Sequence, residues 1–337
     1  MNGSKLCQVV KKGELIYSGD IVHPCVRFSK NKFLGYDWWM IYTPYYNNNS
    51  KIENPILCFG NSDVDGKPPI KWEYYKQVVS KPTEGYNSDP NMYFDDSGLN
   101  IFWRESNTYR TKLDHHYRAT YGLTIKLNGE IINYENPILA ENRRYFDNEV
   151  SASFMEKDNQ LFAYAMSLRF KNESWIFRSS FLNKLSNKFL SFLSLLEFTS
   201  HIKSYGISIW NGNSLNNSFK LLKTVKFENL NSLYKPWHLD TFNFNNITYA
   251  IVQTNKANSD ISLAYYNTEI GESFKFYPKP LITCNHIDKF GIYKATGFVQ
   301  DGMFYLYYTA QDKSNRKLNK MYLTSILFTE LLETLDK

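Results

Sequence analysis

The sequence predicts an all-β fold, and three observations support this prediction. Tyrosine and phenylalanine are abundant, with 26 and 24 copies among 337 residues, and both favour the half-buried surface of a sheet. Short apolar runs of strand length alternate with turn-forming Asp, Asn, Ser and Gly. One layout, a polar signature followed by a short strand, a turn and an aromatic strand, recurs along the chain. Repeats built from a few strands are typical of a β-propeller, in which each repeat forms one blade.

The clearest copy of this layout is the stretch 86–105, YNSDPNMYFDDSGLNIFWRE. It opens with the polar loop Ser88–Pro90 and continues in the apolar run Met92–Phe94. A turn at Asp95–Gly98 leads to a second run, Leu99–Trp103. Asp, Ser and Gly supply the positive φ angles and side-chain turns that hairpins need, so a β-hairpin is predicted here.

Five such units follow one another along the chain. Their polar signatures lie, in order, at His23, Asp89, the stretch Glu149–Ser153, His238 and Lys294. Further strands are predicted in the runs Cys25–Phe28, Tyr36–Pro44, Ile56–Phe59, Tyr121–Leu127, Leu161–Met166, Thr248–Val252 and Phe304–Thr309. Because the units occupy nearly the whole chain and no Pro-, Gly- or Ser-rich linker separates them, we predict a single five-bladed propeller domain over residues 1–337.

Three segments lie outside the regular repeat. The interval between the third and fourth signatures is the longest, which predicts an insertion at about 181–205, either a helix or a long hairpin. The last strand, Lys320–Phe328, would expose an unpaired edge unless Gln8–Tyr17 pairs with it and completes the fifth blade. The tail, about 329–337, is expected to form a short helix.

Composition and charge exclude several classes of protein. The net charge of +6 comes from dispersed basic residues, so we expect no nucleic-acid partner. No apolar run reaches the roughly 18 residues of a membrane span, and the N-terminus lacks the apolar core of a signal peptide. The four cysteines are far apart and form no CxxC pair, which favours free thiols. We therefore expect a cytoplasmic or virion-associated protein without a membrane partner, and the sequence leaves its oligomeric state open.

Several segments are similar to a known family. They are HPCVRF, YDWWMIYTPY and ENPIL in the first unit, YNSDPNMYF and LNIFWRE in the second, SASFMEKDNQLFAYAM in the third, PWHLDTF in the fourth and KATGFVQDGMFYLYYTA in the fifth. Over roughly residues 20–325 the chain resembles the five-bladed β-propellers of the glycoside hydrolase superfamily, families 43, 32, 68 and 117. It also resembles related propellers in phage receptor-binding proteins that recognise cell-wall glycans. The resemblance implies that an oligosaccharide or polysaccharide binds in a central pocket.

The resemblance also implies catalytic roles. In the catalytic members a carboxylate on blade one is the base or nucleophile, one on blade two orients the sugar, and a glutamate on blade three is the acid. Asp89 matches the second group and Glu149 is the candidate for the third. His23 stands where the first carboxylate is expected, with Asp20 as a nearby alternative. Glycoside hydrolysis usually requires two carboxyl groups, whereas histidine can act as a base near neutral pH, so Asp89, Glu149 and His23 are our catalytic candidates.

Other polar and aromatic residues are expected to face the same pocket and bind substrate: Glu53, Asn54, Arg104, Trp237, His238, Asp240 and Lys294. A tryptophan beside polar groups, as at Trp237, suits stacking against a sugar. Structural roles remain open as alternatives: Asp89 as a turn cap, Arg104 in an ion pair with Glu105, Trp237 in blade packing and His23 in a bridge across the axis.

Two functions follow as hypotheses. The first is a glycoside hydrolase-like enzyme that acts on a polysaccharide; the alternative is a non-catalytic glycan-recognition protein, such as a virion component. No cofactor is expected, no residue is predicted to bind a metal, and a central divalent cation such as calcium is left open.

Overall fold

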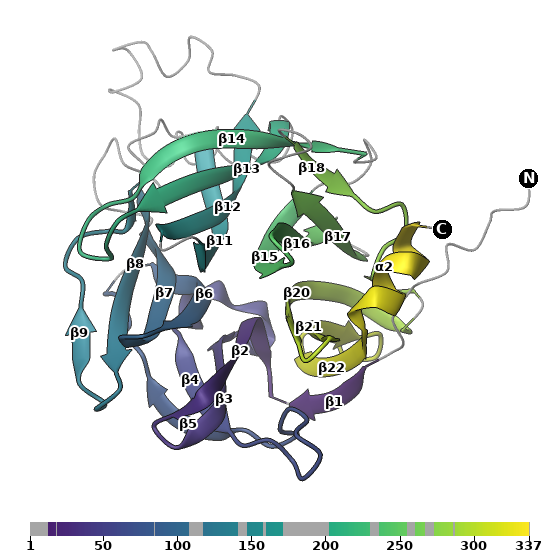
Figure 1. The fold of residues 1–337 in the computed structure, drawn as a ribbon, viewed down its shortest axis with the longest axis horizontal. Coiled ribbons are helices and arrows are strands. Elements are labelled where there is room, and N and C mark those ends of the chain that lie inside the picture. Colours follow the sequence, from purple (N-terminus) through teal and green to yellow (C-terminus); the bar gives the residue numbers. More distant parts are fainter. Residues whose placement is uncertain are drawn as a thin grey trace, which may run out of the picture.

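The computed structural model describes residues 13–17, 19–83, 85–107, 117–140, 147–157, 160–170, 202–229, 236–254, 260–266, 273–285 and 287–336. Their strands form five groups that surround a central axis (Figure 1). The first strand of each group lies nearest the axis and contacts the first strands of both neighbouring groups. The fold is therefore all-β and a five-bladed propeller, as the sequence predicts.

The first two blades follow the predicted order of strands. Blade 1 consists of β2 (Ile21–Phe33), β3 (Tyr36–Pro44), β4 (Ile56–Gly60) and β5 (Glu73–Gln77). Blade 2 consists of β6 (Tyr86–Asp95), β7 (Gly98–Asn107) and β8 (Tyr117–Lys126), with the short strands β9 (Ile131–Asn133) and β10 (Leu139–Ala140) both paired to β8. The β6–β7 hairpin turns where predicted, because the Asp95 carboxylate accepts hydrogen bonds from the backbone N–H groups of Ser97 and Gly98.

Blades 3 and 4 are joined into one nine-stranded sheet. Blade 3 consists of β11 (Asp147–Lys157), β12 (Gln160–Phe170), β13 (Ile202–Gly212) and β14 (Lys220–Glu228). Blade 4 consists of β15 (Pro236–Phe244), β16 (Ile247–Thr254), β17 (Asp260–Tyr266) and β18 (Ser273–Phe276), with β19 (Ile282–Thr283) paired to β17. The outermost strands β14 and β18 pair in parallel, which connects the two blades at the rim.

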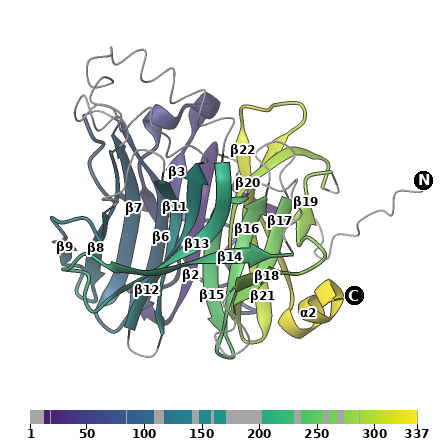
Figure 2. The same cartoon turned by 90° about the horizontal axis from the view of Figure 1, so that it is seen from above.

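Blade 5 combines both ends of the chain. It consists of β20 (Lys289–Gln300), β21 (Met303–Asp312) and β22 (Asn319–Leu327), and β1 (Glu14–Tyr17) adds the outer strand. β1 pairs antiparallel with β22, for example Glu14 with Leu323, so the predicted closure of the ring is confirmed over residues 14–17. The helix α2 (Phe328–Asp336) follows at the periphery of the ring (Figure 2).

The hydrophobic core is divided among the interfaces between blades. Among the described residues, five clusters of buried side chains each join one pair of neighbouring blades. Both faces of strand β3 are buried, which explains its continuous apolar sequence. Trp38 and Met40 pack towards blade 5, whereas Trp39 and Ile41 pack towards blade 2. Successive side chains of a strand point to opposite faces, and both faces of a blade are covered.

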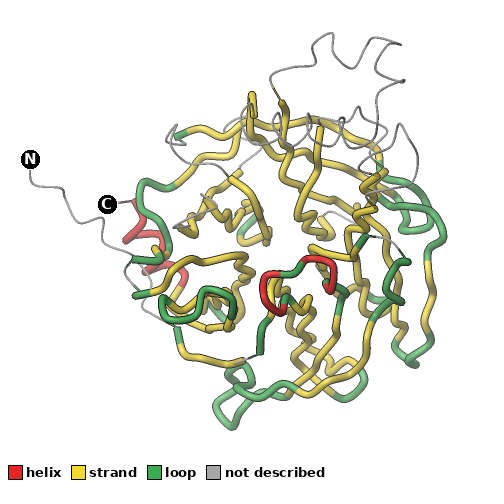
Figure 3. The backbone as a smooth tube through the Cα atoms, turned by 180° about the vertical axis from the view of Figure 1, so that it is seen from behind, coloured by secondary structure: helices red, strands yellow, loops and turns green. Residues whose placement is uncertain are grey.

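The loop between β3 and β4 contains two short 3₁₀ helices, Tyr46–Asn48 and Ser50–Ile52. They lie close to the centre of the ring on the face opposite to that in Figure 1 (Figure 3). Residues 202–205 of the expected insertion belong to β13, and the rest of the range 181–205 lies outside the described residues. None of the described helices is long and apolar enough to cross a membrane.

Candidate active site

A β-bulge interrupts the innermost strand of each blade at the position of the polar signature. The pairing register shifts between Val22 and Cys25 in β2, between Ser88 and Asn91 in β6 and at the matching positions of β11, β15 and β20. In the first three blades the bulged residue has a left-handed backbone: φ is 55° at His23, 49° at Asp89 and 53° at Ser151. A bulge bends the strand and redirects its side chains. Backbone strain of this kind is frequent at functional sites.

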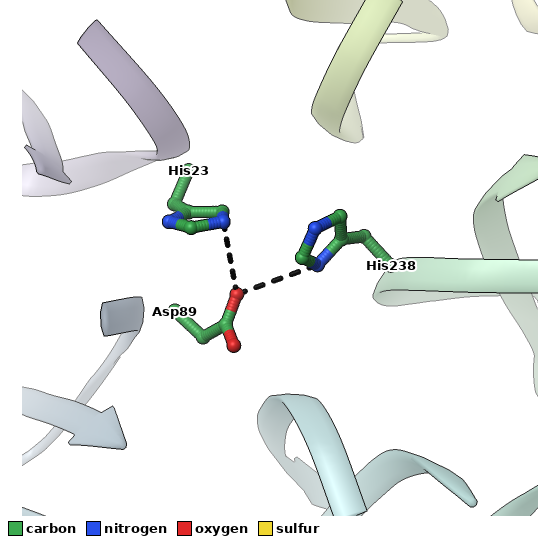
Figure 4. Close-up of side chains that lie close together, drawn as sticks. All are labelled: His23, Asp89 and His238. Atoms are coloured by element: carbon green, nitrogen blue, oxygen red, sulfur yellow. Dashed lines mark ion pairs between the residues drawn. The ribbon is translucent and has the colours of Figure 1, made fainter. Parts of the chain in front are cut away.

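Three of the bulged strands bring His23, Asp89 and His238 together (Figure 4). His23 Nε2 lies 3.3 Å from Asp89 Oδ1, and His238 Nδ1 lies 3.4 Å from the same oxygen. One ligand atom from each residue falls within 4.8 Å of the other two, and all three side chains are buried. Each of these residues is predicted from the sequence to face the pocket, and the structure brings them into one cluster.

The Asp89 carboxylate is held in its ionised form. Arg104 Nη2 lies 2.7 Å from Oδ2, and Ser151 Oγ donates a hydrogen bond to Oδ1 over 3.1 Å. Burial alone would raise the pKa of Asp89, but the charge of Arg104 and the interactions with His23 and His238 outweigh it, and the pKa lies well below its usual value. Arg104 therefore acts as the counter-ion of the cluster, whereas the sequence analysis expected it to bind substrate or to pair with Glu105.

Glu53 contacts the other side of the His23 ring. Glu53 Oε2 lies 3.1 Å from His23 Nδ1 and accepts a hydrogen bond from Thr43 Oγ1 over 3.3 Å. Burial raises the pKa of the Glu53 carboxyl despite the neighbouring His23, and burial lowers the pKa of His23 itself. Both groups are thus pushed towards their neutral forms, and the contact with Glu53 orients the His23 ring with Nε2 towards Asp89.

The second imidazole and a tyrosine complete the cluster. His238 Nδ1 lies 2.5 Å from Ser151 Oγ, and burial lowers the pKa of His238. The Tyr293 ring lies 5.1 Å from the His23 ring and 5.0 Å from the His238 ring, between centroids. Tyr45, in the loop that carries the short helices, lies 5.9 Å from Tyr293 and links that loop to the cluster. Ser151 belongs to the signature stretch Glu149–Ser153 predicted from the sequence, whereas Tyr293 and Tyr45 were not predicted, although Tyr293 directly precedes the signature residue Lys294.

Asp240 belongs to a different layer of the axis. Its carboxylate accepts hydrogen bonds from Arg27 Nη2 at 2.9 Å, Asn91 Nδ2 at 3.1 Å, Ser153 Oγ at 2.8 Å and Thr296 Oγ1 at 2.5 Å. These residues lie on β2, β6, β11 and β20, and Asp240 lies on β15, so one side chain ties together the innermost strands of all five blades. Burial would raise its pKa, but Arg27 and Thr296 lower it to about 2. The expectation that Asp240 binds substrate is therefore replaced by a structural role, because its oxygens are already occupied.

Two other candidates, Glu149 and Asn54, also have structural partners. Glu149 Oε2 accepts a hydrogen bond from Ser208 on β13, within its own blade, and its catalytic role stays a prediction. Asn54 donates to the backbone carbonyl of Val79 and accepts from Asn87, so it links blades 1 and 2.

Asp20 and Trp237 flank the site without joining its centre. Asp20, the alternative base, accepts hydrogen bonds from the backbone N–H groups of Asn47 and Asn319 and therefore fastens a loop to β22. Trp237 is half-buried and lies edge-on to His238, with ring centroids 6.1 Å apart, and it also packs against the core between blades 3 and 4. Lys294 is buried on β20 beside Tyr293.

Comparison with known proteins supports the fold. No family model matches the chain, and no curated protein matches its sequence. Among solved structures, an N-acetylgalactosamine deacetylase from F. plautii, crystallised with blood group B trisaccharide, superposes with a TM-score of 0.69 at 14% identity and covers 97% of both chains.

Glycoside hydrolases superpose as well. A GH43_1 enzyme from Xanthomonas citri has a TM-score of 0.61 at 9% identity, covering 93% of this chain and 90% of its own. A GH32 β-fructofuranosidase from Bombyx mori has a TM-score of 0.60 at 12% identity, covering 95% of this chain and 63% of its own. At these identities the similarity establishes the five-bladed propeller fold that this chain shares with families 43 and 32.

Proposed function

We propose that this protein is a carbohydrate-active hydrolase whose central cluster binds a divalent transition metal, and that it removes an acyl group from a glycan. The observation that carries the proposal is the convergence of His23, Asp89 and His238, with ligand atoms within 4.8 Å of one another at the axis of the ring. The deacetylase with the same fold over its whole length supports this reaction class.

The three side chains fit a metal ion in number, chemistry and spacing. Two imidazoles and one carboxylate form a donor set that suits zinc, iron or manganese, whereas calcium prefers six to eight oxygen ligands. Two ligand atoms that are each about 2.1 Å from one ion lie roughly 3.0–3.4 Å apart at octahedral or tetrahedral angles. The separations of 3.3 and 3.4 Å from Asp89 Oδ1 to the two histidine nitrogens agree with this spacing, whereas the three atoms together lie within 4.8 Å, so the two imidazoles would move closer together on binding an ion.

The surrounding side chains would prepare the ligands. Glu53 at His23 Nδ1 fixes the tautomer that directs the Nε2 lone pair towards the centre, as second partners of metal-binding histidines usually do. Arg104 pairs with Asp89 Oδ2, so that Asp89 Oδ1 faces the imidazole rings of His23 and His238. A bound divalent ion would supply Lewis acidity towards a carbonyl oxygen and lower the pKa of a coordinated water.

Further residues are in place for substrate binding and proton transfer. Tyr293 and Tyr45 offer aromatic surface beside the cluster, on which a sugar ring can stack. Tyr293 also carries a hydroxyl, which can donate a hydrogen bond to the reacting acyl group. Glu53 is a carboxyl group of the cluster that is not needed as a metal ligand and can exchange a proton.

Hydrolysis of a glycosidic bond is a second candidate, favoured by a specific observation. Asp89 and Glu53 contact opposite nitrogens of the His23 ring, which places two carboxyl groups at one site. Two carboxyl groups are the usual requirement for glycosidic cleavage. Solved structures with this fold include two xylosidases and a β-fructofuranosidase, whose names state that they cleave such bonds.

One experiment separates these functions. Acetylated oligosaccharides are incubated with the protein, and both free acetate and new reducing ends are measured, with and without a chelator. We expect acetate release that stops on chelation and returns with added Zn²⁺ or Mn²⁺, together with about one metal ion per chain by elemental analysis. Chelator-insensitive release of reducing ends would favour the glycosidase instead. Glycan binding without either product would support a recognition protein.

A further inference from the structure

Lys294 is a buried cation that has no hydrogen-bond partner in the part of the chain that the structure describes. It lies on β20 in the bulge between Ile292 and Ala295, and its side chain is 1% exposed. Nζ has no hydrogen-bond partner among the residues that the structure describes. An ammonium group that leaves water without gaining an acceptor is strongly unfavourable, and buried charges are normally paired. Lys289 on the same strand illustrates the usual arrangement, because its ammonium group pairs with Asp312.

A second buried nitrogen, on a residue whose charge Lys294 influences, also lacks a hydrogen-bond partner among the described residues. His238 Nε2 is buried and has no hydrogen-bond partner in the described part of the chain, whereas Nδ1 of the same ring faces Ser151 and Asp89. Lys294 lies near enough to act on the charges of both His238 and Asp240. Asp240 is not its acceptor, because the oxygens of that carboxylate are occupied by the partners on the other blades.

We propose that Lys294 and His238 form an anion subsite at the floor of the central site, and that it takes a carboxylate group. The inference rests on the proposed function in one respect: with Nδ1 used as a metal ligand, Nε2 carries the ring proton and becomes a donor. Lys294 then provides a charged donor and His238 a neutral one, for the two oxygens of one carboxylate. A hydroxyl group could accept one of these bonds, but it would leave the ammonium charge uncompensated.

Two sources could supply the carboxylate. One is the free acid that deacylation of a glycan releases, and the other is an acidic sugar within the glycan. The depth of Lys294 favours a small group that enters end-on, and both sources present such a group.

The subsite is tested with sodium acetate as the probe. The thermal midpoint of the metal-loaded protein is measured across a range of acetate concentrations, at constant ionic strength set with a bulky anion salt. We expect a saturable rise in the midpoint for the wild type. Lys294→Met keeps the length of the side chain and removes the charge, and it should weaken acetate binding roughly ten- to a hundredfold, the usual effect of one charged hydrogen bond.

Lys289→Met is the matched control, because it removes a buried lysine of the same strand that already has a partner. It should lower the midpoint without acetate but leave the acetate-dependent rise unchanged. Lys294→Met should instead hold or raise the midpoint without acetate, because it removes an unpaired buried charge. An equal acetate response in wild type and Lys294→Met, or no response in the wild type, would overturn the subsite.

The source is decided by a second comparison that does not require turnover. Binding of a uronic-acid oligosaccharide is compared with binding of its methyl ester by calorimetry, in wild type and Lys294→Met. A preference of the wild type for the free acid that Lys294→Met loses assigns the subsite to an acidic sugar. Equal binding of acid and ester, with the acetate response intact, assigns it to the released acid. Because neither assay measures catalysis, the subsite can stand even if the proposed deacylation fails.

Discussion

Four side chains contact the Asp89 carboxylate, and three of them come from other blades: His23 from blade 1, Ser151 from blade 3 and His238 from blade 4. Arg104 is the fourth and comes from the neighbouring strand β7. The position of this one carboxylate therefore depends on the closure of the ring. Its left-handed backbone, with φ of 49°, is the local cost of turning the side chain towards the axis.

Asp89→Asn tests this residue directly. The amide keeps the shape of the side chain but carries no charge, so it loses the pairing with Arg104 and is a poor metal ligand. We expect the rate of product release to fall by a factor on the order of 100 or more, and glycan affinity to change only a few fold. Initial rates and calorimetry measure the two effects. Asp301→Asn, in an exposed turn, is the control. Unchanged activity in Asp89→Asn would remove this residue from the site.

The carboxyl group of Asp260 should make the stability of the protein depend on pH, independently of the candidate active site. Burial raises the pKa of this carboxyl on β17 from 3.8 to about 6. Because the pKa is higher in the folded than in the unfolded state, ionisation of Asp260 destabilises the folded protein. This destabilisation is absent below about pH 4, grows between about pH 4 and 6, and is complete above about pH 6. The melting temperature of Asp260→Asn should therefore equal that of the wild type at pH 4 and lie a few degrees above it at pH 7.

Melting curves between pH 4 and 8 measure this difference. The exposed Asp96→Asn serves as the comparison, because solvent surrounds its side chain in both states. A gap between Asp260→Asn and wild type that stays constant with pH would show that the carboxyl is not destabilised by burial.

At the scale of elements, the seam in blade 5 depends on four residues. β1 supplies Glu14–Tyr17 as the outer strand on β22, and Gly13 N–H donates a hydrogen bond to the Tyr308 hydroxyl. Ile16 packs into the core between blades 5 and 1. Although β1 is short, it contributes to stability because it pairs with β22, whose backbone N–H and C=O groups would otherwise be unpaired at the edge of the sheet.

Deletion of residues 1–17 should therefore lower the melting temperature by several degrees. The deletion removes backbone hydrogen bonds to β22 and the buried Ile16 side chain, and the exposed edge also favours association. Deletion of residues 1–12 alone keeps β1 and is the matched control, for which we expect no change. Calorimetry and light scattering measure both variants. Equal melting of the longer deletion and the wild type would contradict a stabilising seam.

At the scale of the whole molecule, the axis has two layers with different tasks. The layer around Asp240 ties the five innermost strands together, and the layer around Asp89 carries the candidate chemistry. In the first layer both oxygens of the Asp240 carboxylate accept hydrogen bonds, whereas in the second His23 Nε2 and His238 Nε2 make no hydrogen bond to the described residues. Fully connected polar networks of this kind fix one arrangement of the surrounding elements.

Removal of the Asp240 charge should loosen the whole ring. Asp240→Leu removes the carboxylate that pairs with the largely buried Arg27 guanidinium, and loss of one member of a buried pair typically costs about 3–5 kcal/mol. The double variant Arg27→Met with Asp240→Leu replaces the pair by apolar groups and should recover part of that loss. Urea unfolding gives the free energies. Additive effects of the two substitutions would show that the pair is not the link between blades.

The sequence alone determined the class of fold and the number of blades, because both follow from local patterns. Alternating apolar residues, turn residues and a repeated polar signature are properties of neighbouring residues in the chain, and the predicted closure by the N-terminal strand followed from counting strands. The candidates His23, Asp89 and His238 were also named correctly as members of one cluster, because they share the signature position.

Only the tertiary structure decided which groups complete the cluster. Glu53 contacts His23 and Glu149 bonds to Ser208, whereas Asp240 serves the structural layer although it lies only two residues beyond His238. Tyr293 joins both imidazoles from another blade. The physical reason is that a bulge turns each side chain by an amount that the local sequence does not specify. The partner that the side chain then meets depends on the register and closure of five separate sheets.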